Sequence, residues 1–228
     1  MKNKIEHIAI IPARKNSKGF KKKNRILFDY TANFLKKINW FDKVIVATDD
    51  TFLKKKIKKF KFVYFLRSKK NATDNASIKS LMIEITNSLK INDVSIIWLF
   101  YLTIPYKKKS DFSNTKKICE KKKFKSAISF RKTLSHPYDC WIIGKRLKKF
   151  IKNDIYRRQD KIKLYEHFHY ISVFKVKELN KLNSELINSN TTPIILNKTD
   201  NLIEIDSKKD FHSFKSYNNK LSKLKKKK

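Results

Sequence analysis

A basic loop close to the N-terminus carries the side chains best suited to chemistry on a phosphate. It spans residues 14–24 and follows an apolar stretch at residues 7–11 that ends at Pro12. Backbone N–H groups, a hydroxyl and several cations lie within it. Together such groups can cradle a triphosphate and offset charge at the phosphorus under attack. The side chains concerned are those of Arg14, Ser17, Lys18 and Lys23. On composition alone, an ordinary basic surface loop is an equal alternative.

Gly19 lies inside this loop and is one of only two glycines in the chain. A sequence that uses glycine so sparingly has reason to keep it where the backbone needs a positive φ or a close approach. We therefore predict such a conformation at Gly19. One glycine makes neither a Walker-type nor a dinucleotide-binding fingerprint, so it indicates no particular nucleotide.

Two acidic residues near the C-terminus, Glu204 and Asp206, are candidate metal ligands. They lie one residue apart at the end of an expected strand, and alternate strand residues point the same way. Two carboxylates placed like this can share a hard cation such as Mg²⁺. The alternative is an acidic turn that caps the following helix.

Three histidines, His136, His167 and His169, are further candidate ligands. Their spacing matches no familiar zinc pattern. We therefore expect them to serve in packing or in contact with a sugar.

Strand-like and helical stretches alternate through the first half of the chain. Apolar runs at residues 7–11, 43–48, 62–66 and 95–101 predict strands, and residues 30–40 and 76–89 show helical spacing, with Asp74 or Asn75 as the second helix's cap. This alternation predicts an α/β fold, in which a mostly parallel sheet is covered by helices on its faces. The basic loop would then lie at the carboxyl ends of the strands, where such sheets bind ligands.

The second half is less regular. Further strands are expected at residues 126–130, 171–174, 192–196 and 202–205, with a final helix at residues 208–217. We interpret residues 1–228 as a single domain. Within it, residues 131–185 would make an excursion near the substrate or a dimerisation arm, and residues 219–228 a basic tail.

The formal net charge of +36 raises the alternative of a nucleic-acid-binding protein. Only seven of the 56 basic residues are arginine, and the lysines are spread along the whole chain. A protein that reads bases or phosphates usually relies more on arginine, whose fork binds both in a bidentate way. We therefore favour a solvated basic surface over nucleic acid as a partner.

The sequence has no apolar run of the roughly 18 residues that a membrane span requires. Its N-terminal residues also lack the apolar segment of a signal peptide. Its two cysteines, Cys119 and Cys140, have neither zinc-site spacing nor the density of a disulfide scaffold. We expect a cytoplasmic protein.

The basic loop resembles the signature of the CMP-sialic acid synthetases (N-acylneuraminate cytidylyltransferases), which reads approximately I-P-A-R-x-x-S-K-x-x-x-x-K-N. All eight fixed residues occur here, from Ile11 to Asn24. Weaker matches follow in the family's order, so that the resemblance covers roughly residues 8 to 210. They are residues 41–49, Arg67 with Ala72-Thr73-Asp74 and Ser77, His136-Pro137, Arg157-Arg158-Gln159-Asp160 with Tyr165, and Glu204-Ile205-Asp206-Ser207.

This resemblance implies a three-layer Rossmann-like nucleotidyltransferase fold with a small dimerisation arm, assembled as a homodimer. It implies transfer of CMP from CTP to an acidic sugar of the sialic (nonulosonic) type, with release of pyrophosphate and Mg²⁺ as cofactor. Catalytic roles would fall on Arg14, Lys18 and Lys23, and the metal on Glu204 and Asp206. The implied nucleotide-binding residues are Ala13, Arg14, Asn16, Ser17, Lys18, Gly19, Lys23, Asn24, Arg67, Asp74 and Ser77.

By the same resemblance, four residues are expected to face the sugar: Tyr101, Arg157, Arg158 and Gln159. A guanidinium suits the sugar's carboxylate. A solvated or dimer-interface arginine pair is nearly as good an interpretation of Arg157 and Arg158.

The chain departs from the family where the sugar is expected to bind. Tyr101 stands where the family's turn, L-L-Q-P-T-S-P-L-R, has a glutamine, and Phe168-His169 stands where it usually has N-G. These departures imply a less hydroxylated acceptor, such as legionaminic or pseudaminic acid. The rival functions are a cytidylyltransferase for another acceptor, such as 3-deoxy-octulosonate, and a basic nucleic-acid-binding protein.

Overall fold

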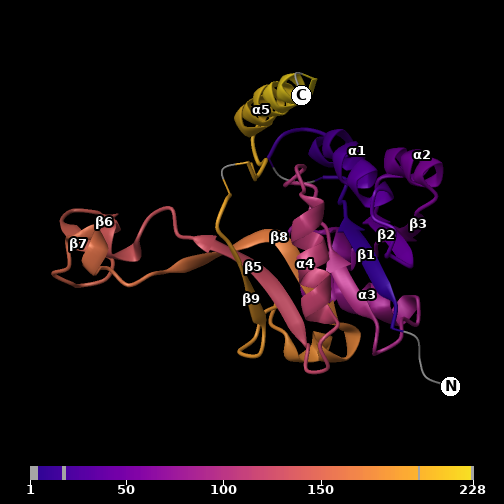
Figure 1. Ribbon diagram of the computed structural model, residues 1–228, viewed down its shortest axis with the longest axis horizontal. Helices are drawn as coiled ribbons and strands as arrows, with labels where there is room; N and C mark the ends of the chain where they lie inside the picture. The colour runs from indigo at the N-terminus through magenta and orange to yellow at the C-terminus, as the bar shows by residue number, and fades with distance from the viewer. Residues whose placement is uncertain (1–4, 17–18, 200, 227–228) are drawn as a thin grey trace.

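The computed structural model describes residues 5–16, 19–199 and 201–226, and shows a three-layer α/β fold around one seven-stranded sheet (Figure 1). The strand order is β3-β2-β1-β4-β8-β5-β9. Within the sheet β8 is antiparallel to both of its neighbours, and the other pairs are parallel. The strands are β1 (His7–Pro12), β2 (Lys43–Thr48), β3 (Val63–Leu66), β4 (Ile96–Leu99), β5 (Ser126–Lys132), β8 (Tyr165–Lys175) and β9 (Thr192–Leu196).

Helices cover both faces of the sheet. One face packs against α1, α2, α4 and α5 through Leu27, Leu53, Phe112 and Phe214. The other face packs against α3 and the short helix η4 (Val176–Lys181), which contribute residues such as Leu81 and Leu179. The α-helices of the described residues are α1 (Lys23–Lys36), α2 (Thr51–Phe60), α3 (Ile78–Ser88), α4 (Lys109–Cys119) and α5 (Lys208–Lys226). Both apolar layers explain why the central strands read as unbroken apolar runs. The α/β class predicted from the sequence is confirmed.

Several predicted elements have different bounds. The first helix begins at Lys23 instead of residue 30, directly after the positive φ of Lys22. The helices α2 and α4 were not predicted, because both sequences are short and mostly polar, with few apolar residues. Ser77 caps α3 by accepting a hydrogen bond from Ser80 N, so the expected cap at Asp74 or Asn75 is wrong.

The strand predicted at residues 202–205 is absent from the described segment 201–226. Leu202 and Ile205 are buried in the core, and Ile205 N donates to Thr103 O at 2.7 Å, but no ladder forms. The apolar pattern is therefore that of an anchored irregular segment. The final helix is longer than predicted and continues to Lys226, through most of the expected basic tail.

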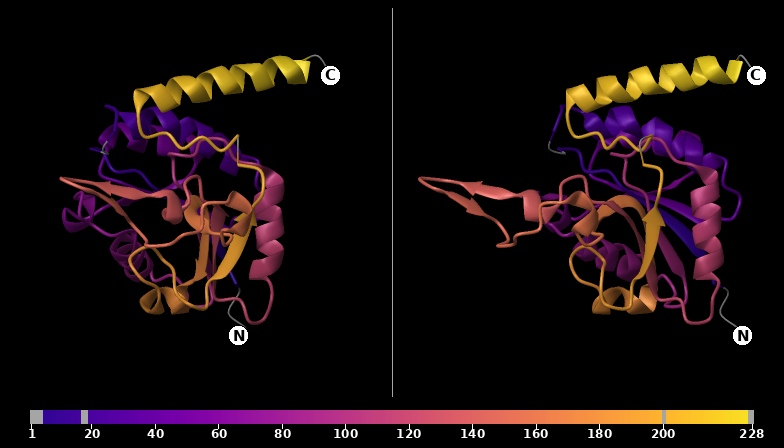
Figure 2. Two further views of the ribbon diagram at one scale, coloured as in Figure 1. Left: turned by 90° about the vertical axis from the view of Figure 1, so that its left-hand side faces the viewer. Right: turned by 60° about the vertical axis from the view of Figure 1, so that its left-hand side comes forward.

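The excursion predicted over residues 131–185 is narrower in the structure. β5 ends at Lys132, and β8, which starts at Tyr165, belongs to the central sheet. A hydrogen bond from Thr133 N to Leu164 O (3.2 Å) closes the base of the projecting part. That part carries the hairpin of β6 (Trp141–Ile143) and β7 (Leu147–Lys149) and extends away from the sheet (Figures 1 and 2).

None of the helices in the described segments is both long and apolar enough to cross a membrane.

A buried lysine fixes the turn after β4. Lys107 Nζ donates to Thr31 Oγ1 (3.1 Å) on α1, to Tyr101 O (3.2 Å) and to Ile104 O. All three partners are uncharged oxygens, and burial lowers the pKa of Lys107 from 10.5 to about 7. The turn is thereby tied to α1 at the edge of the sheet where β4 ends.

This burial makes stability depend on pH. Below about pH 7 Lys107 is charged in both the folded and the unfolded state, and the folded state carries the full cost of the buried charge. Between about pH 7 and 10.5 the folded state loses this proton first, so the unfolded state binds more protons and stability rises. We expect the free energy of unfolding of the wild type, relative to Lys107→Met, to rise by about 3 to 5 kcal/mol across that range. Urea unfolding at pH 6.5 and about 10 measures it, with Lys109→Met as the control. An equal difference at both pH values would contradict the assignment.

Candidate active site

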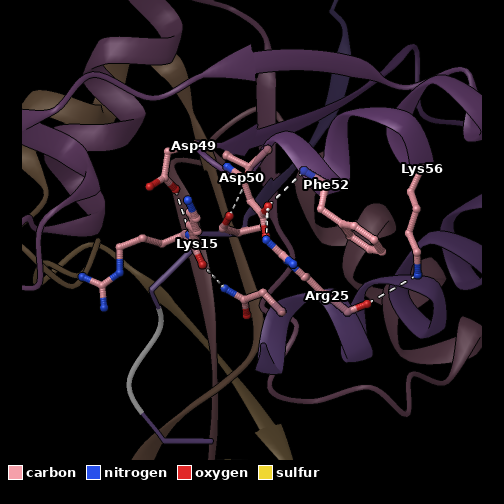
Figure 3. A network of polar contacts seen from close by, with 10 residues as sticks. Lys15, Arg25, Asp49, Asp50, Phe52 and Lys56 are labelled. Carbon is pink, nitrogen blue, oxygen red and sulfur yellow. Dashed lines mark hydrogen bonds and ion pairs between the residues drawn. The ribbon is translucent and has the colours of Figure 1, made fainter. Parts of the chain in front are cut away.

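The basic loop is held at both of its ends to the carboxyl end of β2. Ala13 N donates to Ala47 O (2.9 Å), and Lys15 N donates to an Asp49 carboxylate oxygen (2.8 Å). From the far end of the loop, Asn24 Nδ2 reaches back to Arg14 O at 2.7 Å. The loop therefore leaves the sheet and returns to it at one point, beside the end of β2 (Figure 3).

A buried carboxylate, Asp50, organises this point. Arg25 donates to both of its oxygens, from Nε at 2.6 Å and from a terminal nitrogen at 2.8 Å. Phe52 N also donates to Asp50, which makes this residue the N-cap of α2. Asp50 N in turn donates to Thr48 Oγ1, whose hydroxyl donates to Ala13 O. The start of the loop, its end and α2 are thus joined through one network (Figure 3).

Gly19 has the predicted positive φ, at 104°. A Cβ atom added there would lie 2.2 Å from the carbonyl oxygen of Asp206 and 3.3 Å from Lys23 Nζ. Gly19 therefore lies close to the backbone of the segment that precedes α5. A larger residue at this position would fit only if the backbone at Asp206 moved. Ser17 and Lys18, two of the loop's predicted phosphate-binding residues, lie outside the described residues.

The same segment supplies the two acidic residues proposed for the metal. Lys23 Nζ donates to Asp206 Oδ1 at 2.9 Å, and the lysine is buried at the first position of α1. Burial raises the pKa of Glu204, while His169 acts in the opposite direction and the charge of Asp206 raises it further. The two carboxylates interact electrostatically although no strand aligns them. The charged side chains of Glu204, Asp206 and Lys23 thus form one cluster beside the loop.

A cavity of about 260 Å³ lies at this carboxyl edge of the sheet. Five of the predicted site residues line it: Arg14, Asn24, Arg67, Asp74 and Tyr101. The remaining lining includes Thr73 and Ala76 before α3 and Thr103 in the turn after β4. Residues far apart in the sequence, on three different connections, therefore meet around one space.

Two guanidinium groups and one carboxylate line this cavity. Arg14 forms an ion pair with Asp74, and Arg67 donates to Asn71 O. Burial lowers the pKa of Arg67, as does the nearby charge of Arg14, while Asp49 acts to raise it. The Nε atom of Arg67 is buried without a hydrogen-bond partner in the described structure. Two close cations with an unused donor favour an anionic ligand.

The ring of Tyr101 lines the cavity at the side where β4 meets β8, and His169 lies next to it. The ring of Tyr101 lies 4.9 Å from that of His169, and burial raises the pKa of Tyr101. Phe168 does not line this side of the cavity, so its expected role beside the sugar is wrong. It is packed in the core, because it alternates with His169 along β8, and Arg131 lies 4.4 Å over its ring.

Three residues that were predicted to face the sugar do not line the cavity within one chain. Arg157, Arg158 and Gln159 are exposed on the projecting arm, and none of them lines the cavity. Two further residues were predicted to bind the nucleotide. Ala13 is buried, and its carbonyl oxygen accepts the hydrogen bond from Thr48 Oγ1 in the Asp50 network, whereas Asn16 is exposed.

The network of Arg25, Asp49 and Asp50 was not predicted as part of the site. Asp49 and Asp50 directly follow a buried strand, which is the position where α/β sheets collect functional residues. Arg25 directly follows the resembling loop. These positions, after the strand and after the loop, are the features of the sequence from which the network could have been predicted.

The donor set at Glu204 and Asp206 fits Mg²⁺, because carboxylates are its usual protein ligands. Among the described residues no group of three His, Cys, Asp or Glu side chains forms a metal cluster. A bound Mg²⁺ would therefore take most of its ligands from phosphates and water, as it commonly does.

Several solved structures have a similar fold. CMP:2-keto-3-deoxy-manno-octonic acid synthetase complexed with CTP is 12% identical, with a TM-score of 0.65 over 94% of this chain and 99% of that one. The 4-diphosphocytidyl-2C-methyl-D-erythritol synthase from Anaerococcus prevotii is 14% identical (TM-score 0.57, 94% and 99% covered). A cytidylyltransferase from Leptospira borgpetersenii is 13% identical (TM-score 0.59, 98% and 95% covered). At these identities the likeness establishes the fold alone. A search of curated proteins finds no match.

The cytidylyltransferase family model matches residues 8–178, which is most of the chain. The chain therefore belongs to the cytidylyltransferase family, and it is a nucleotidyltransferase that uses CTP. The nucleotide chemistry predicted from the sequence is confirmed at this level.

The Asp50 network predicts an effect on catalysis from a residue outside the cavity. Arg25→Ala removes both hydrogen bonds that join the end of the loop to Asp50. Because the loop then loses its fixed geometry, kcat/KM for CTP should fall roughly 10- to 100-fold. Arg25→Lys keeps the charge without the bidentate fork, and should recover only part of the loss. Initial rates of pyrophosphate release measure this, with Lys58→Ala on the exposed side of α2 as control. Full activity of Arg25→Ala would show that the loop is positioned by other contacts.

Proposed function

We propose that this enzyme transfers CMP from CTP to the anomeric hydroxyl of an acidic nonulosonic sugar and releases pyrophosphate. The observation that carries the proposal is the cavity in which Arg14 and Arg67 lie together, beside a loop fixed to the end of β2. Arg14, the loop's Lys18 and Lys23 would hold the triphosphate and offset its charge. Arg67, Asn24 and Asp74 would lie near the nucleoside.

Catalysis in this proposal consists of positioning and charge neutralisation. Arg14 is paired with Asp74 and Lys23 with Asp206, so that both cations are held in place before a nucleotide enters. Bound at Glu204 and Asp206, Mg²⁺ would neutralise phosphate oxygens. Because Gly19 is packed against Asp206, the loop and the acidic segment would hold their positions together.

The acceptor is an acid in this proposal, since the site is rich in cations. A nonulosonic acid follows from the resemblance of the loop to sialic acid synthetases. The octonic acid handled by the first structural relative above supports 3-deoxy-octulosonate as the second candidate. A cytoplasmic location remains a prediction.

We also propose that the enzyme is a homodimer in which the projecting arm is covered. The arm exposes large apolar side chains, which include Ile143, Leu147 and Tyr156, each at least 70% exposed. Monomeric proteins rarely leave such clusters in water. Arg157, Arg158 and Gln159 would then contact the acidic sugar only as part of the assembled dimer.

The decisive assay combines pyrophosphate release with mass analysis of the product. CTP and UTP are each offered with N-acetylneuraminic, legionaminic and pseudaminic acids, with 3-deoxy-octulosonate and with a carboxamide analogue. We expect a CMP adduct with at least one acid, no reaction of the carboxamide, and better use of a deoxy nonulosonate than of N-acetylneuraminic acid. Good activity with UTP, or activity only with 3-deoxy-octulosonate, would refute the sialic-type assignment. Strongly salt-dependent DNA binding without turnover would favour the nucleic-acid alternative.

In the same assay of pyrophosphate release, Arg14→Ala should slow turnover about 100-fold or more.

The metal proposal predicts a change in Mg²⁺ dependence. Asp206→Asn removes a carboxylate while keeping an oxygen that can accept from Lys23. The Mg²⁺ concentration for half-maximal activity should rise by about tenfold or more, with little change in the thermal midpoint. Asp29→Asn, which alters a carboxylate paired with Lys56, is the control. An unaltered Mg²⁺ titration would assign the acidic pair a purely structural role.

A further inference from the structure

The segment that carries Arg67 leaves the sheet at the end of its edge strand, β3. This strand ends at Leu66, Arg67 follows it directly, and the short helix η1 (Lys70–Ala72) comes next. The residues on either side of Arg67, Leu66 and Ser68, are exposed. Packing around those two neighbours therefore does little to fix the segment. A defined position for the guanidinium group requires hydrogen bonds from the segment to another element.

Glu84, on α3, holds this segment with both of its carboxylate oxygens. Oε1 accepts a hydrogen bond from Ser68 N at 2.8 Å, and Oε2 accepts one from the side-chain amide of Asn71. Asn71 is 4% exposed, and its carbonyl oxygen accepts the hydrogen bond of the Arg67 guanidinium group. One carboxylate thus fixes both the residue that follows Arg67 and the residue that binds the Arg67 side chain.

The helix α3 is a firm support for this carboxylate. Leu81 and Ile85, on the neighbouring positions of the helix, are fully buried in the core. Glu84 also acts on the charge of the segment. Burial lowers the pKa of Arg67, and Glu84 is among the groups that act in the opposite direction. The same side chain therefore orients the segment and favours the charged form of its guanidinium group.

We propose that Glu84 is a positioning residue for the nucleotide, which it serves through Arg67. Glu84 does not line the cavity, whereas Arg67 does. A guanidinium group binds through a planar fork of N–H donors, so its contribution to binding depends on how that plane is oriented. An orientation fixed before the ligand enters lowers the entropy lost on binding. The inference rests on the proposed placement of the nucleoside beside Arg67.

Binding of CTP to substituted proteins tests this role. Glu84→Ala removes both acceptor oxygens, and Kd for CTP in the presence of Mg²⁺ should rise about tenfold in isothermal titration calorimetry. Glu84→Gln keeps one acceptor oxygen without the charge, and should recover part of the loss. The matched control is Glu120→Ala, which removes an exposed carboxylate paired with Lys116 at the end of α4. It should leave Kd within about twofold.

A double-mutant cycle separates a positioning role from a general effect on the fold. Arg67→Ala should itself weaken the binding of CTP. In that background Glu84→Ala should have little further effect, because the group that it positions is gone. If Glu84→Ala does not fold, Glu84→Gln takes its place in the cycle.

Two results would overturn the inference and leave the proposed function standing. One is unchanged binding of CTP by a folded Glu84 variant, and the other is the same weakening with and without Arg67. A different result bears on the proposed function: if Arg67→Ala binds CTP as tightly as the wild type, the proposed placement of the nucleoside is wrong, and this inference with it.

Discussion

The geometry of the nucleotide loop depends on one buried carboxylate. Asp50 is 1% exposed, and its side chain binds Arg25 and the first turn of α2. A buried charge is tolerated only where its hydrogen bonds are made, so each of these contacts constrains the others. Through Thr48 the same network reaches Ala13, at the start of the loop. Both ends of the loop are therefore fixed to β2, and Arg14 takes its position beside the cavity from that anchorage.

The sheet was largely predictable because burial leaves a direct mark on composition. Strands covered on both faces are unbroken apolar runs, and β1 and β2 were predicted within a residue of their bounds. The helices α2 and α4 were missed, since both are short and mostly polar. Ile205 is apolar for a different reason: it anchors an irregular segment. Contacts such as Lys23–Asp206, 183 residues apart, follow from no local pattern, and only the resemblance brought both residues to attention.

The site separates two kinds of polar chemistry. Arg14 and Arg67 make one side cationic, which suits an anionic nucleotide. Tyr101 makes the other side aromatic, and the ring of His169 lies 4.9 Å from that of Tyr101. Of the departures from the sialic acid synthetase pattern, Tyr101 and His169 fall on this second side, and Phe168 lies in the core. A common way of binding the nucleotide would thus be combined with a selection of the acceptor that is specific to this chain.

A crystal structure of the complex with CTP and Mg²⁺ tests the position of the site most directly. The triphosphate is expected beside Arg14 and Lys23, with the nucleoside in the cavity of about 260 Å³ that Arg67 lines. The side of the cavity that Tyr101 lines should then remain open to the acceptor. Nucleotide bound instead in the larger hollow of about 510 Å³ beside Phe62 and Tyr64, with Arg14 still paired only to Asp74, would contradict this placement.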